Sequence, residues 1–298
     1  MKRLGVYIWI LCLLILFTYC KTNKLHNKNG EFSVSATTKV YFSPGNLQWS
    51  ATNGGSATTT HVVAGGGTAA GTWRFAPNQW DMISFANGNI DSSYTGWIDL
   101  FGWGTSGYNN KYPYMTSCKS ADYGDGSDNS NIAGTNYDWG VYNAIYNPKT
   151  NTTDAPGTWR TLTKDEWVYL LKTRTTTSGI RYAFAEVHGL YGVIIVPDDW
   201  TSSIYALTYY EVNIINDTDW AKMEDVGCVF LPAANCRYGP SLYYHSRGCY
   251  WSATASQNNI PYSSVDAYYL DIIPNYEVGE YVRDGYFGMS VRLVKDVK

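Results

Sequence analysis

The sequence predicts an α+β fold of small antiparallel sheets with one or two helices and long loop insertions. Three features of the 298-residue chain support this fold class. Short apolar or alternating runs recur between turn residues, one segment carries a clear helix start, and long stretches of Gly, Ser, Thr and Asn have little to bury. No proline-rich or charged linker interrupts residues 31–298, so we expect one domain there.

Six short runs have the pattern of β-strands, because they are apolar or alternating and are bounded by turn residues. These runs are Lys39–Ser43, Gly192–Pro197, Gly227–Ala233, Cys249–Thr254, Ala267–Ile273 and Met289–Lys295. In the last run, alternation predicts that Met289, Val291 and Leu293 face the core and that Ser290 and Arg292 face solvent.

One segment, Thr161–Arg174, is predicted to be helical. Thr163 is followed three residues later by Glu166, the spacing of a reciprocal capping box. Trp167, Leu170 and Leu171 then fall on one helical face, which is typical of a helix that packs on a sheet.

Two long loops are expected at Ala51–Gly71 and Ser117–Thr135. Between them lie Thr72–Asp81, which contains two tryptophans, and Gly96–Tyr108, where Trp and Gly alternate. These segments predict irregular structure held by a few large side chains. We expect most tryptophans in the core rather than in a sugar-stacking platform, and Trp251 is ambiguous. The tryptophans concerned are Trp73, Trp80, Trp97, Trp103, Trp139, Trp159, Trp167 and Trp251.

The N-terminus has the features of an export signal over residues 1–20. Lys2 and Arg3 precede an apolar run from Val6 to Phe17, which is shorter than the roughly 20 residues of a membrane-spanning helix. Cys20 follows, and residues 21–30 form a polar tether. The arrangement resembles a bacterial lipoprotein signal, which implies lipidation of Cys20 and an outer-membrane lipoprotein of the cell envelope. An uncleaved anchor and ordinary secretion are the alternatives.

Composition argues against several classes of partner. The net charge is −3 and few residues are charged, so there is no basic field for nucleic acid. Membrane attachment would therefore come from the anchor at Cys20 rather than from a polybasic surface.

Neither a metal site nor a cofactor is predicted. The four histidines lack metal-binding spacings, and the oxygen-rich loop around Asp125 has no EF-hand pattern, so calcium there is a minor alternative. Cys118, Cys228, Cys236 and Cys249 remain outside the signal, and export permits disulfides. A pair among the last three is the favoured bridge.

Several sequence blocks taken together resemble one family. They include YFSPGNLQW (41–49), GWIDLFGWGTSGY (96–108), GTWRTLTKDEWVYLL (157–171), GVIIVPDDW (192–200), YWSAT (250–254) and SVRLVK (290–295). This order resembles exported proteins of the major paralogous domain type and the variable target proteins of diversity-generating retroelements. The resemblance implies a C-type-lectin-like fold of the formylglycine-generating-enzyme branch, in which Lys39–Ser43 pairs with Met289–Lys295.

The segment 243–286 is the candidate ligand-binding face. It is rich in Tyr, Ser and Asn, which give large contact area and adaptable hydrogen bonds. In the retroelement targets the corresponding segment is rewritten at adenine-containing codons. The predicted binding residues below are permitted outcomes of that process, whereas Gln257, Glu277 and Glu280 are not and would have to be fixed by the template. The predicted ligand-binding residues are Tyr243, Tyr244, His245, Ser246, Arg247, Tyr262, Ser264, Asp266, Tyr268, Tyr281, Arg283, Asp284 and Tyr286. We expect these side chains to be exposed on one patch, with Trp251, Leu270 and Ile272 in the core.

These observations predict an exported, lipid-anchored, non-enzymatic protein that binds a protein or glycan ligand at a surface. One alternative is an enzyme resembling the formylglycine-generating enzymes and acting through Cys236 and Cys249. Another is a structural protein of the cell envelope whose Tyr-rich segment packs against neighbours.

Overall fold

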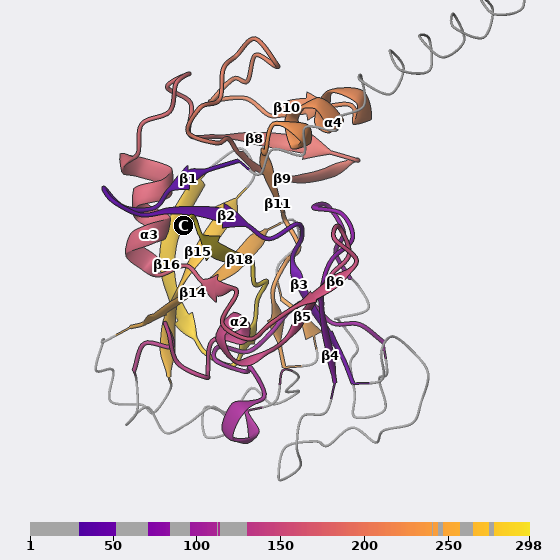
Figure 1. The fold of residues 1–298 in the computed structure, drawn as a ribbon, viewed down its shortest axis with the longest axis vertical. Coiled ribbons are helices and arrows are strands. Elements are labelled where there is room, and N and C mark those ends of the chain that lie inside the picture. Colours follow the sequence, from indigo (N-terminus) through magenta and orange to yellow (C-terminus); the bar gives the residue numbers. More distant parts are fainter. Residues whose placement is uncertain are drawn as a thin grey trace, which may run out of the picture.

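The computed structural model describes residues 30–51, 71–83, 96–111, 113, 130–239, 241–243, 247–256, 265–273 and 277–298. These residues form small antiparallel and mixed sheets with short helices, which confirms the α+β class (Figure 1). The predicted signal, tether and lipidation site at Cys20 lie outside them, as do most of the two predicted loops. No helix among the described residues has the length and apolarity needed to cross a membrane.

The two ends of the described chain meet in one sheet, with the strand order β1-β2-β18-β7. Its strands are β1 (Phe32–Ser33), β2 (Lys39–Phe42), β18 (Leu293–Asp296) and β7 (Arg160–Thr161). Strand β18 runs antiparallel to β2, with Val294 opposite Phe42, and antiparallel to β7 on its other side. This register confirms the predicted pairing of the N-terminal and C-terminal strands.

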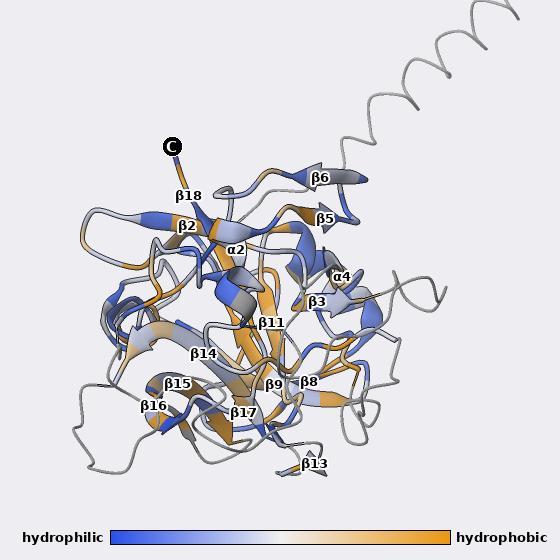
Figure 2. Cartoon of the chain, turned by 90° about the horizontal axis from the view of Figure 1, so that it is seen from below, coloured by the Kyte–Doolittle hydropathy of each residue, from blue (hydrophilic) through white to orange (hydrophobic). Residues whose placement is uncertain are grey.

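A second sheet has the order β10-β8-β9-β11 and lies with helix α4 at one end of the molecule (Figure 1). Its strands are β10 (Asn213–Ile215), β8 (Tyr182–Val187), β9 (Leu190–Ile195) and β11 (Val229–Pro232). Helix α4 (Asp217–Asp225) lies between β10 and β11 along the chain. Strand β10 pairs with β8 in parallel, whereas the other pairs are antiparallel. Strands β9 and β11 are strongly apolar and lie near the centre of the molecule in Figure 2.

Three further sheets contain the other strands described. One has the order β3-β4-β5-β6, with β3 (Leu47–Ser50), β4 (Thr72–Phe75), β5 (Ile145–Asn147) and β6 (Thr152–Asp154). Another contains β14 (Gly248–Ala255), β15 (Asp266–Ile273) and β16 (Glu277–Asp284), and the smallest contains β13 (Ser241–Leu242), β12 (Arg237–Tyr238) and β17 (Phe287–Gly288). Two further short helical segments are η2 (Tyr108–Asn110) and α2 (Trp139–Tyr142).

The predicted capped helix is present as α3 (Lys164–Val168), which continues into a π-helical turn, η4 (Tyr169–Thr173). The Thr163 hydroxyl accepts from the Glu166 amide at 3.2 Å, and the Glu166 carboxylate accepts from the Thr163 amide at 2.8 Å. Trp167, Leu170 and Leu171 are buried, and α3 packs on β14, β15 and β16. The capping-box prediction is therefore confirmed.

The predicted orientation of the last strand run is wrong at two positions. Ser290 and Arg292 are buried, although alternation placed them toward solvent. The Arg292 guanidinium donates to Asn46 Oδ1 at 3.2 Å and to Gln79 Oε1 at 2.6 Å. The chain here is covered on both sides, so alternation does not separate a buried face from an exposed one.

Most tryptophans lie in the core, as expected. Trp73, Trp103, Trp139, Trp159, Trp167 and Trp251 are buried, whereas Trp80 and Trp97 are half-buried. Trp73 lies in strand β4 opposite Trp49, so the irregular structure predicted around it is wrong at that point. The described residues bury their apolar side chains in three clusters that continue from sheet to sheet.

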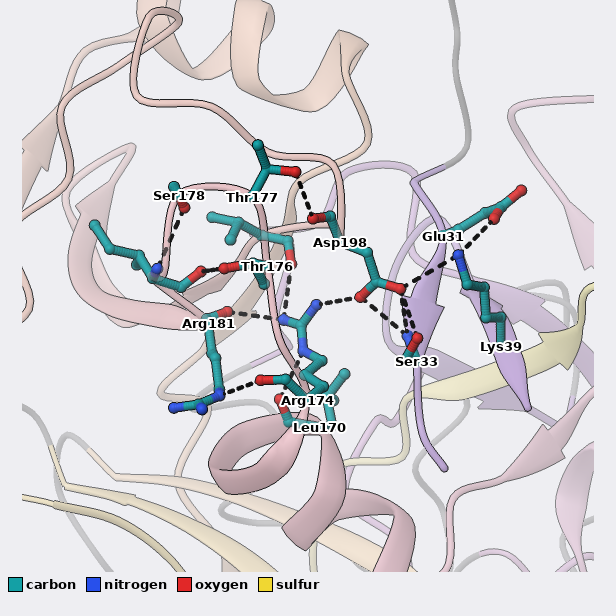
Figure 3. A network of polar contacts seen from close by, with 12 residues as sticks. Glu31, Ser33, Lys39, Leu170, Arg174, Thr176, Thr177, Ser178, Arg181 and Asp198 are labelled. Atoms are coloured by element: carbon teal, nitrogen blue, oxygen red, sulfur yellow. Dashed lines mark hydrogen bonds and ion pairs between the residues drawn. The ribbon is translucent and has the colours of Figure 1, made fainter. Parts of the chain in front are cut away.

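A polar network joins the first strand to the second sheet (Figure 3). The Asp198 carboxylate accepts from the Ser33 hydroxyl at 2.7 Å and from Arg174 Nη1 at 2.9 Å. Arg174, whose side chain is fully buried, also donates to the carbonyl oxygens of Leu170, Val196 and Arg181 at 2.7–2.9 Å. Four hydrogen bonds thus fix this guanidinium, and its Asp198 partner in turn holds the N-terminal strand through Ser33.

Candidate functional site

The smallest sheet is the base of the candidate site. Strand β12 pairs with β17, so that Tyr238 lies opposite Phe287 and Arg237 opposite Gly288. A Cβ atom at Gly288 would lie 3.0 Å from the Cβ and Nε atoms of Arg237, so glycine permits this close pairing. The buried Arg237 guanidinium also donates to the carbonyl oxygens of Gly239 and Leu100.

Four tyrosines and one arginine gather on this base, and we call Tyr238, Tyr243, Tyr281, Arg283 and Tyr286 the aromatic patch. The ring centroid of Tyr238 lies 5.9 Å from that of Tyr243 and 5.7 Å from that of Tyr286. The Arg283 guanidinium lies 5.8 Å from the Tyr243 ring centroid. Tyr281 and Arg283 are two residues apart on β16, so they share one face of that strand.

The tyrosines of the patch combine exposed rings with buried support. Tyr238 and Tyr281 are each 39% exposed and Tyr243 is 49% exposed, whereas Tyr286 is half-buried. Beneath them, Phe287 is buried and stacks on the Tyr286 ring at 5.3 Å. Such a surface offers rigid apolar area with phenol groups at its rim, which suits contact with a partner more than chemistry.

Arg247 extends the same face toward β15. Its guanidinium lies 3.5 Å from the Asp271 carboxylate, which also accepts from the Tyr269 hydroxyl at 3.4 Å. Tyr269 lies opposite Tyr281 across the β15–β16 pair, so a continuous row of polar and aromatic groups connects Arg247 to the aromatic patch.

The expectation of one patch is wrong for three other predicted residues. Asp266, Tyr268 and Asp284 lie on the opposite face of the sheet from Tyr281 and Arg283. Asp266 is buried, with 8% of its surface exposed, and it lies directly opposite Asp284. Tyr268 lies on that same face, and the ammonium of Lys164 in helix α3 lies 5.0 Å from its ring centroid. Because successive side chains of a strand point to opposite faces, these residues cannot join Tyr281 and Arg283.

Five predicted ligand-binding residues lie outside the described part of the chain. They are Tyr244, His245, Ser246, Tyr262 and Ser264. The minor calcium alternative near Asp125 falls outside it as well, and the described residues contain no cluster of three metal-binding side chains.

The expected core positions of the segment are confirmed, since Trp251, Leu270 and Ile272 are buried. Sequence reasoning missed Tyr238, which precedes the predicted segment by five residues. The signal was present in the sequence, because Tyr238 lies in the same Tyr-containing stretch as Tyr243. The predicted segment began at Tyr243 and so left Tyr238 out.

The two cysteines of the enzyme alternative do lie together. The neighbouring Cys236 thiol and burial raise the pKa of the Cys249 thiol well above its usual range. Both residues are fully buried, and Cys228 lies in a different cluster. All three are thiols in the structure. A buried thiol with a raised pKa is a poor nucleophile, because the thiolate is the reactive form.

A recess of about 350 Å³ opens between the terminal sheet and the end of helix α4. Its lining combines the cations Lys149 and Lys295 with Glu224, Gln79 and the edge of Trp159. The described lining residues come from outside the segment 243–286, so this recess is separate from the aromatic patch.

Comparison of the whole chain with known proteins gave no match to a family model, to a curated protein or to a solved structure.

Proposed function

We propose that this protein is an exported, lipid-anchored, non-enzymatic binding protein whose ligand face is the aromatic patch. The observation that carries the proposal is the contact of the Tyr243 ring with Tyr238 and with the Arg283 cation, with Tyr281 on the same face of β16 as Arg283. These three tyrosines are each at least 39% exposed. The ligand is a protein or a glycan displayed at a surface.

Physical chemistry supports binding at such a surface. Tyrosine buries large area with two rotatable side-chain bonds, so contact costs little conformational entropy. An arginine beside the rings adds a charged donor for carboxylate or carbonyl oxygens of the ligand. Interfaces are enriched in Tyr and Arg, and such residues dominate binding energy when a partner removes water from them.

Export, lipidation at Cys20 and the C-type-lectin-like fold are part of the proposal. The sequence of the first 20 residues supports the anchor. The antiparallel contact of β2 with β18, and the packing of capped helix α3 on a three-stranded sheet, are features that the family resemblance implies.

The enzyme alternative is less well supported. It requires a thiolate that substrate can reach, whereas Cys236 and Cys249 are fully buried and the pKa of the Cys249 thiol is raised. The structural-envelope alternative differs from a binding function in its partner, which would be a fixed neighbour in the envelope.

The proposal can be tested by applying the labelled protein to arrays of immobilised glycans and of purified cell-surface proteins. The patch variant combines Tyr238→Ser, Tyr243→Ser and Tyr281→Ser. We expect each substitution at a binding hot spot to cost about 2 kcal/mol, or roughly 30-fold in Kd, against any ligand found with the wild type.

A matched control variant, Tyr191→Ser with Tyr210→Ser, removes tyrosines that are 44% and 91% exposed on the second sheet and its adjoining loop. The control should bind as the wild type does. Equal binding by the patch variant would refute the aromatic patch as the ligand face.

A further inference from the structure

The backbone brings Cys236 and Cys249 into register. A parallel bridge joins Asn235 to Gly248, so the next residue of each segment is a cysteine, and the two lie side by side. Neighbouring strands are about 4.8 Å apart, which falls within the Cα separations of about 4.4–6.8 Å found in disulfides. Residues at matching positions of a parallel pair project to the same side, and both cysteine side chains belong to one buried core cluster.

We infer that Cys236 and Cys249 form a structural disulfide when the chain folds in the presence of a disulfide oxidant. In the reaction, each cysteine loses its S–H proton and the pair gives up two electrons to form one S–S bond. The oxidant, a small-molecule or protein disulfide, takes up the two electrons and two protons and becomes two thiols. Closure must precede completion of the core, because both cysteines are fully buried afterwards.

The bridge would act directly on the aromatic patch. Residues 237–248 lie between the two cysteines along the chain and include Tyr238 and Tyr243. The Tyr243 amide donates to the Cys236 carbonyl at 2.9 Å, so a bond at Cys236 would fix one anchor of this segment. The other anchor is strand β14, whose Cys249 carbonyl accepts from the Ser290 amide at 2.9 Å.

Peptide mapping, combined with a Cys228 variant, can show whether Cys236 or the nearby Cys228 is the partner of Cys249. Trypsin cleaves after Lys222, Arg237, Arg247 and Arg283, and releases peptide 223–237 with Cys228 and Cys236 and peptide 248–283 with Cys249. The full-length protein is refolded with oxidised and reduced glutathione, alkylated after unfolding, digested and mapped by mass spectrometry. We expect the two peptides to be linked before reduction and separate after it.

Two single variants distinguish the partners. Cys228→Ser should keep the linked pair, whereas Cys236→Ser should abolish it. Reduction of the wild-type protein should also lower its melting temperature by about 6 °C, as expected for loss of a loop of this size. Recovery of Cys236 and Cys249 as alkylated thiols from the glutathione mixture would overturn the inference, as would a link that Cys228→Ser removes. The mapping is independent of ligand binding, so its failure is distinguishable from failure of the proposed function.

Discussion

Replacing Asp198 by Asn is expected to lower the free energy of unfolding by about 3 kcal/mol, since it leaves the buried Arg174 charge without its carboxylate. Breaking a buried ion pair costs about 3–5 kcal/mol, and the lower end applies because Asp198 remains 16% exposed at its side chain. The three carbonyl contacts of Arg174 would persist and limit the loss. The Ser33 hydroxyl can still donate to the new amide oxygen.

Urea unfolding at pH 7 measures this loss, and Asp219→Asn is the matched control. Asp219 also lies 2.8 Å from a cation, Lys222, but at the surface of α4, so its removal should cost far less than the loss of Asp198. Equal effects of the two substitutions would refute the argument that burial of Arg174 sets the magnitude.

The same comparison has a defined pH dependence. Burial raises the pKa of Asp198, but the Ser33 hydrogen bonds and the Arg174 contact outweigh it, and the net shift is downward. The stabilisation is therefore present above the ordinary carboxyl pKa of about 3.9 and is lost as pH falls through the lower folded-state value. The difference between wild type and Asp198→Asn should shrink below about pH 4.

Three further outcomes are expected. Tyr243→Ser should change stability by no more than about 0.5 kcal/mol in thermal melts, since its ring is half exposed. Glu166→Ala should cost about 2 kcal/mol in urea unfolding, because it removes half of the capping box and a bidentate partner of Arg160 at 2.7–2.8 Å. Burial raises the pKa of Asp138 to about 6, so its contribution to stability should fall by about 1 kcal/mol between pH 5 and pH 7. Asp138→Asn should abolish that pH dependence, and an unchanged slope would contradict the assignment.

Local signals in the sequence predicted local structure well. The Thr163–Glu166 spacing identified α3 because a capping box involves residues within one turn. Helix α4 was missed, since its segment is mostly charged and only Trp220 and Met223 are buried on it. Its N-cap, Asn216, was a readable signal, because the side chain accepts from the Asp219 amide.

The sequence predicted which types of residue form the candidate site, but not which face of the sheet each of them lies on. Tyr281 and Arg283 lie on the face of the sheet that carries the aromatic patch, whereas Tyr268 lies against α3 on the opposite face. The sequence carries this alternation, but only the packing of α3 shows which face is covered. For the same reason, the burial of Arg292 depends on side chains from Asn46 and Gln79, which lie far away along the chain.

Strand β18 lies between β2 and β7, so the last described strand completes a sheet that the first described residues begin. Its pairing with β2 joins strands from opposite ends of the described chain, and the ribosome synthesises β18 after all the other described strands. This sheet therefore closes only once β18 has left the ribosome. A message truncated just before Leu293 would yield a product in which β2 and β7 both present unpaired edges, and such edges recruit strands from other molecules. Strand β18 thus protects two sheet edges at once, and aggregation is the expected fate of products that lack it.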